Sequence, residues 1–152
     1  MDALAFFSGI TDGSVSLKDA GQLHAADVFA IARVGAAALQ GGRFAQAEQV
    51  FVALAALEPK ERAHWLHVAA ARHGAGNVDG AVSALGEFLA RADGVDDEDV
   101  ARALLLRAEL AGRTNVDLAR GDLGRARALT SAPAKKLVDA ALGVATVAGG
   151  RA

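Results

Sequence analysis

The 152-residue sequence contains no cysteine and no tyrosine, and it contains only two prolines. Without cysteine there is no disulfide framework and no thiolate chemistry. Although 53% of the residues are hydrophobic, no apolar run approaches the roughly 20 residues that a membrane-spanning helix needs. The stretch 1–13 lacks the early positive charges of a secretory signal. We therefore expect a cytoplasmic protein that does not insert into membranes.

Strong charge of one sign is also missing, since the net charge is −2. The charge is unevenly distributed: residues 1–100 carry 7 basic and 14 acidic side chains, whereas residues 101–152 carry 9 and 4. Dense basic patches with stacking aromatics are absent, so we expect no nucleic-acid partner. The sequence also has no GxSxG motif and no glycine-rich phosphate loop. These absences predict a protein that is not an enzyme and binds no cofactor.

What the sequence does contain is a repeat of apolar residues. After Gly42, such residues recur at three- and four-residue steps, as on one face of a helix, until Pro59 ends the pattern. They are Phe44, Ala47, Phe51 and Leu54. The preceding helix has a facing stripe, in which Gly35 is expected to let two backbones approach closely.

The same arrangement then returns, with Trp65 in the place of Ile31 and Gly76 in the place of Gly42. Both steps match the period of the tetratricopeptide repeat, about 34 residues, in which each repeat is a pair of helices. The step to a third set of apolar residues is longer, so the acidic loop before it is expected to hold about four residues more than this period requires. The residues predicted to be buried between helices are Phe44, Ala47, Phe51, Trp65, Ala81, Leu85 and Phe88.

The spacing therefore predicts an all-α fold of three tetratricopeptide-like helix pairs, an α-solenoid, with a C-terminal capping helix. The predicted divisions are an N-terminal segment over 1–23, repeats within 24–132, and a capping helix and tail over 133–152. The three repeats are expected at about 28–61, 62–95 and 100–132. A short helix is expected at Met1–Ser8, and the last helix is expected to run from Pro133 to Val147.

One helix carries more apolar surface than a helix core requires. Residues 28–39 are apolar nearly all round, with Arg33 as their one charge, although a surface helix buries only part of its circumference. Either this helix is central, or its second face awaits a ligand. The first helix of each pair should line the concave side, which predicts an apolar peptide-binding trough there. The predicted binding residues are Phe29, Ala32, Ala36, Leu39, Leu66, His67, Ala70, His73, Leu104 and Ala108; the alternative for each is burial in the core.

Three histidines lie on the helix expected in the second repeat: His64, His67 and His73. The spacing of His64 and His67 suits metal ligands, but no carboxylate sits at a matching turn of that helix. We therefore predict no metal site. His67 and His73 are expected to hydrogen-bond to the backbone of a bound peptide, which an apolar wall alone cannot satisfy.

The run Ser16-Leu17-Lys18-Asp19 after Gly13, followed by G-R-F-x-x-A-x-x-x-F-x-x-L at 42–54, resembles the class II chaperones of type III secretion, the SycD/LcrH type. The resemblance covers nearly the whole chain and implies three tetratricopeptide repeats with a final helix. It also implies a concave groove that holds an extended segment of a hydrophobic translocator protein. Because N-terminal helices often mediate dimers in that family, segment 1–23 is a candidate dimerisation arm and a homodimer is the expected assembly.

Two other functions remain open from the sequence. The chain could be a tetratricopeptide adaptor that scaffolds a complex through its charged convex side, or a chaperone of secretion-needle subunits. A groove chaperone should depend on apolar contacts and only modestly on salt. An adaptor should depend instead on basic side chains of the C-terminal third, which are Arg120, Arg127, Lys135 and Lys136.

Overall fold

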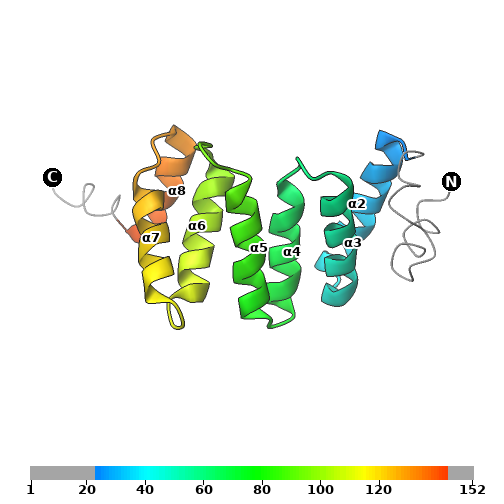
Figure 1. The fold of residues 1–152 in the computed structure, drawn as a ribbon, viewed down its shortest axis with the longest axis horizontal. Coiled ribbons are helices and arrows are strands. Elements are labelled where there is room, and N and C mark those ends of the chain that lie inside the picture. The colour runs from blue at the N-terminus through cyan, green and yellow to red at the C-terminus, as the bar shows by residue number, and fades with distance from the viewer. Residues whose placement is uncertain (1–22, 144–152) are drawn as a thin grey trace. The chain divides into compact units, whose positions relative to one another are not determined.

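The computed structural model describes residues 23–143, and in this range it has seven helices and no strand (Figure 1). The chain divides into two compact units, Met1–Ala84 and Leu85–Ala152, so the division falls inside one helix, α5 (Val78–Ala90). The first unit contains α2 (Ala25–Gln40), α3 (Phe44–Leu57) and α4 (Ala63–Gly74), and the second contains α6 (Glu98–Ala111), α7 (Val116–Arg127) and α8 (Ala132–Leu142). The predicted all-α fold of three helix pairs and a last helix is confirmed.

Several predictions fall on residues outside the described range. They are the helix at Met1–Ser8, the dimerisation arm over 1–23 except its last residue, and the Ser16–Asp19 run. The last helix begins close to the predicted Pro133, but it ends at Leu142, before the predicted Val147. The residue after it is Gly143, a residue type that commonly ends helices.

The sequence repeat is visible in the hydrogen bonds that end α2 and α4. Gly42 and Gly76 both have positive φ angles, 71° and 79°, which glycine adopts without steric cost. The next N–H bonds back across the helix end, from Arg43 to the Ala38 carbonyl and from Asn77 to the Arg72 carbonyl, each at 2.8 Å. These equivalent bonds are those of a Schellman helix end, so the first two repeats match in their backbone hydrogen bonds as well as in their sequence.

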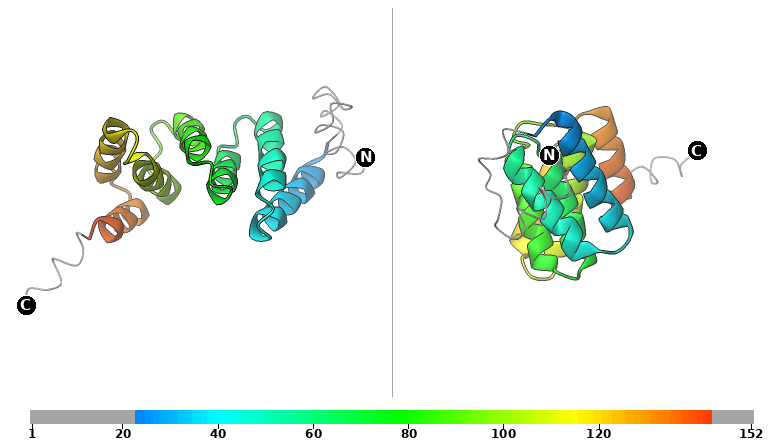
Figure 2. Two further views of the ribbon diagram at one scale, coloured as in Figure 1. Left: turned by 90° about the horizontal axis from the view of Figure 1, so that it is seen from below. Right: turned by 90° about the vertical axis from the view of Figure 1, so that its right-hand side faces the viewer.

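Small residues let α2 and α3 pack closely where they contact each other, and Figure 2 shows these two neighbouring helices, in blue and cyan, at an angle to each other. A Cβ atom on Gly35 would lie 2.7 Å from Cγ1 of Val50, so only glycine fits where α2 crosses α3. Ala38, Ala47 and Ala71, one from each of α2, α3 and α4, form a fully buried cluster. The close approach predicted at Gly35 is therefore confirmed.

Most residues predicted to lie between helices are buried: Ala47, Phe51, Ala81, Leu85 and Phe88. Phe44 and Trp65 are only half-buried, which corrects the prediction for both. Phe44 is the first residue of α3, and its ring packs on Gly74 at the end of α4. Trp65 lies in the first turn of α4, and tryptophan is so large that it is rarely buried completely.

In the second unit, α6 packs against both α7 and α8. Arg107 of α6 binds Asp122 of α7 through two hydrogen bonds, from Nε at 2.7 Å and from a terminal nitrogen at 2.6 Å. Only 2% of Asp122 is exposed, and a buried charge of this kind depends on its partner. The step from the start of α5 to the start of α7 is longer than the step from the start of α3 to that of α5, which agrees with the longer spacing predicted for the third repeat.

A second carboxylate ties the α5–α6 loop to the start of α8. Asp96 Oδ2 accepts hydrogen bonds from the Thr130 N–H at 2.7 Å, the Thr130 hydroxyl at 2.9 Å and the Ser131 N–H at 3.0 Å. These bonds favour the charged form. The Thr130 backbone contributes most, and together they lower the Asp96 pKa to about 2.

Candidate functional site

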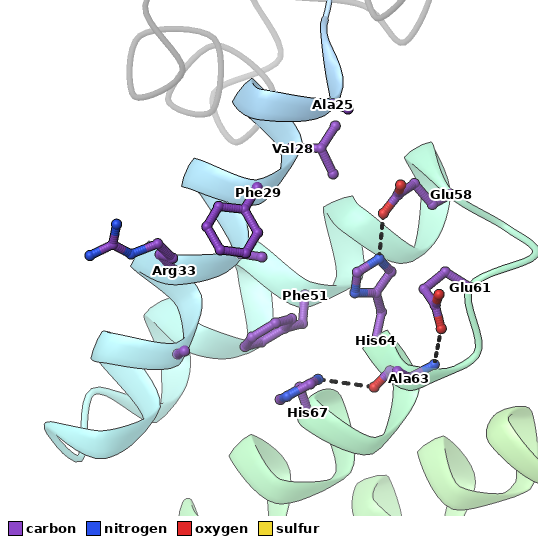
Figure 3. Close-up of a pocket in the computed structure, with 12 residues that line it drawn as sticks. Ala25, Val28, Phe29, Arg33, Phe51, Glu58, Glu61, Ala63, His64 and His67 are labelled. Atoms are coloured by element: carbon purple, nitrogen blue, oxygen red, sulfur yellow. Dashed lines mark hydrogen bonds and ion pairs between the residues drawn. The ribbon is translucent and has the colours of Figure 1, made fainter.

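An open pocket of about 520 Å³ lies in the first unit, between α2 and the start of α4 (Figure 3). Most of its wall is apolar, as is typical of sites that bind apolar groups. The residues that line it are Ala25, Val28, Phe29, Ala32, Arg33, Ala36, Phe51, Glu58, Glu61, Ala63, His64 and His67. α2 contributes six of them, which accounts for its apolar character on more than one face.

Phe29 is the side chain that stands out in this pocket, because 67% of it is exposed. Ala32 and Ala36, one and two turns further along α2, are small and leave space beside the ring. Burying a large aromatic side chain would stabilise the protein by roughly 25 cal/mol for each Å² removed from water. The pocket therefore offers an apolar group of a partner both a surface and the room to cover it.

His67 lies against the aromatic side chain of Phe51, with ring centroids 4.3 Å apart and nearly parallel planes. Its Nδ1 is 3.0 Å from the Ala63 carbonyl. A carbonyl only accepts hydrogen bonds, so Nδ1 carries the proton and Nε2 is an acceptor in the neutral ring. Burial lowers the pKa of His67, which keeps the ring neutral at pH 7. His67 thus supplies a hydrogen-bond acceptor on an otherwise apolar wall.

His64 and two glutamates form the polar edge of the pocket. His64 is buried, and its Nε2 lies 2.7 Å from Glu58 Oε2. Glu61 Oε1 accepts a hydrogen bond of 3.0 Å from the Ala63 N–H at the start of α4. Both carboxylates come from the α3–α4 loop, and Figure 3 shows them on the opposite side of Phe29 from Arg33. The pocket consequently has an acidic edge and a basic edge.

The pocket gathers four of the predicted binding residues, Phe29, Ala32, Ala36 and His67. Other predicted residues of the first unit lie elsewhere. Leu39 packs on the alanine cluster of α2, α3 and α4, Leu66 is half-buried, and Ala70 and His73 are exposed. For all four of these residues, contact with a partner stays a prediction.

Leu104 and Ala108 require a correction. Their exposed fractions are 1% and 5%, so neither side chain lies on the surface where the sequence analysis placed it. The reason is that α6 has neighbours on two sides, because α8 packs against it as well as α7. Periodicity along α6 shows that two faces are apolar without showing that the last helix covers one of them.

Helix periodicity does not reveal the acidic edge, because Glu58 and Glu61 belong to a loop. The sequence repeat does indicate residues of α4 that line the pocket. A shift by one repeat relates Phe29 to Ala63 and Arg33 to His67, and all four line the pocket. Applying that shift to Phe29 would have found Ala63.

Within the part of the chain that the structure describes, no three His, Asp or Glu side chains are placed to hold a metal ion. His64 instead bonds to Glu58, and His67 to a backbone carbonyl. In the same range, no helix combines the length and the apolar character that crossing a bilayer requires.

No protein-family model matches this sequence, and no curated protein matches it. A solved structure is similar: PcrH in complex with the chaperone-binding region of PopB. The match has a TM-score of 0.68 at 20% identity and covers 80% of this chain and 97% of PcrH. The chain has the PcrH fold. The pocket lies on a scaffold that, in PcrH, belongs to a complex with a segment of another protein.

Proposed function

We propose that this protein is a chaperone that binds an extended apolar segment of a partner protein in the pocket between α2 and α4. The observation that carries the proposal is the exposed Phe29 ring beside an open apolar pocket. An exposed apolar segment of a partner risks aggregation, and a preformed pocket removes it from water without any chemistry. Phe29 forms one wall, Ala32 and Ala36 leave space for the partner's side chain, and His67 accepts a backbone N–H.

The partner that we propose is a translocator-like protein of type III secretion. Two observations support it: the resemblance of the 42–54 run to the class II chaperones, and the fold shared with PcrH, which was solved with the chaperone-binding region of PopB. On this proposal the protein acts in the cytoplasm, before the partner is secreted, and performs no catalysis. A homodimer formed through segment 1–23 belongs to the same proposal.

The test begins with peptides selected by the protein itself. A display library of random peptides is panned against the full chain, and the enriched peptides are synthesised with a fluorophore for polarisation binding assays. We expect enrichment of apolar side chains. We also expect Ala36→Trp to weaken binding at least 10-fold without lowering the melting temperature, because the indole fills the pocket.

Arg127→Glu is the matched control on α7, where the side chain is exposed. Loss of binding with Arg127→Glu but full binding by Ala36→Trp would overturn the proposal in favour of the adaptor. Recovery of no peptide by the folded protein would also count against a groove that holds extended segments.

A further inference from the structure

The charges around the pocket are sorted to opposite sides of its apolar wall. Glu58 and Glu61 lie together on the α3–α4 loop, and Arg33 lies across Phe29 from them (Figure 3). The basic residues of the same loop, Lys60 and Arg62, do not line the pocket. An occupant that extends from the apolar wall over the loop therefore meets carboxylates first.

Both carboxylates are held in position by existing hydrogen bonds. Glu58 uses Oε2 for His64, and Glu61 uses Oε1 for the Ala63 N–H. Between residues 23 and 143, the second oxygen of each makes no further hydrogen bond or ion pair. Glu58 is itself partly open to solvent, with 42% of its side chain exposed. Each carboxylate thus keeps an acceptor for a cation, and little ordering is needed to present it.

We propose that the pocket selects a partner segment in which an apolar residue is followed or preceded closely by lysine or arginine. The apolar side chain enters beside Phe29 and Ala36, and the cation lies at the edge formed by Glu58 and Glu61. Arg33 disfavours a cation at the opposite edge, so the charge also sets the direction of the segment. This inference rests on the proposed function, because it names the chemistry of the same site's occupant.

The experiment uses three versions of a peptide enriched on the full chain, identical except that the residue beside the apolar anchor is Lys, Gln or Glu. They are measured against the unmodified protein and a Glu58→Gln, Glu61→Gln double variant. Glutamine keeps an oxygen that accepts the His64 and Ala63 bonds while removing the charge. Glu109→Gln, at an exposed position on α6, is the control for a general change in net charge.

We expect the Lys peptide to bind roughly 3–10-fold more tightly than the Gln peptide, and the Glu peptide to bind most weakly. The double variant should remove this preference, so that the three peptides bind it with similar affinity. Glu109→Gln should retain it, and added salt at about 0.5 M should reduce it.

Equal binding of the three peptides, still blocked by Ala36→Trp, would overturn the cation preference and leave the proposed function standing. Binding of no peptide would overturn both. Sedimentation of the protein alone tests the other occupant: self-association that Ala36→Trp abolishes would assign the pocket to a second copy of this chain and overturn the inference.

Discussion

In the first unit three helices meet at alanine side chains, and the Glu48–Arg72 pair between α3 and α4 is only partly buried. In the second unit the carboxylate that joins α6 to α7 is almost completely buried, and a further carboxylate binds the loop before α8. Ala38, Ala47 and Ala71 are the contact points of α2, α3 and α4. In the second unit, Asp122 holds α6 to α7 and Asp96 holds the start of α8. The first unit leaves Phe29 exposed beside its pocket, while α8 packs on α6 in the second. The same helix pairing therefore leaves an open pocket in one unit and a covered core in the other.

Of the substitutions that test this contrast, Asp122→Ala is expected to have the largest effect on stability. The change leaves the Arg107 guanidinium largely buried without its partner, which should cost about 3–5 kcal/mol of unfolding free energy. Amide hydrogen exchange should then accelerate across α6, α7 and α8 much more than across α2, α3 and α4. Asp117→Ala, on the exposed face of α7, is the control and should change little. Equal acceleration of hydrogen exchange in both units would show that the Arg107–Asp122 pair does not stabilise the second unit specifically.

A smaller effect is expected from enlarging alanines of the first unit. Ala47→Leu should lower the free energy of unfolding by roughly 1–3 kcal/mol, because the site is fully buried where helices cross. Ala36→Leu points into the pocket and should change it by less than about 0.5 kcal/mol. Chemical denaturation of the two variants checks the difference. Similar losses for both would mean that Ala36 packs against the core and does not face open space.

The smallest effect concerns Asp96 and depends on pH. Its pKa is lowered from 3.8 to about 2 in the folded protein, so its stabilising contribution is complete above pH 3.8 and disappears as the pH falls through 2. Asp96→Asn should therefore lower the melting temperature at pH 6, and the difference from the unmodified protein should shrink towards pH 2. Asp93→Asn in the same loop is the control. A melting-temperature difference that stays constant with pH would show that the charge of Asp96 does not cause it.

The sequence was informative where local spacing controls structure. Gly42 and Gly76 end their helices through equivalent bonds, and turn chemistry of this kind is readable from one repeat to the next. The α2 side of the pocket was partly predictable for the same reason, since Phe29 and Ala36 lie on an apolar face of that helix. Glu58 and Glu61 were not predictable, because only folding brings the α3–α4 loop to that face. The covering of Leu104 likewise depends on where α8 packs, which no periodicity within α6 reveals.

The alanine cluster limits which substitutions this chain can accept during evolution. A leucine core can exchange leucine for isoleucine or methionine at nearly constant volume, but Ala38, Ala47 and Ala71 have only glycine and serine near their size. Glycine costs about 1 kcal/mol within a helix, and serine brings a hydroxyl that needs a partner. Substitution is therefore confined at the helix crossings and freer at Ala32 and Ala36. Related chains should keep the scaffold of the first unit, while the residues that shape its pocket should vary more freely.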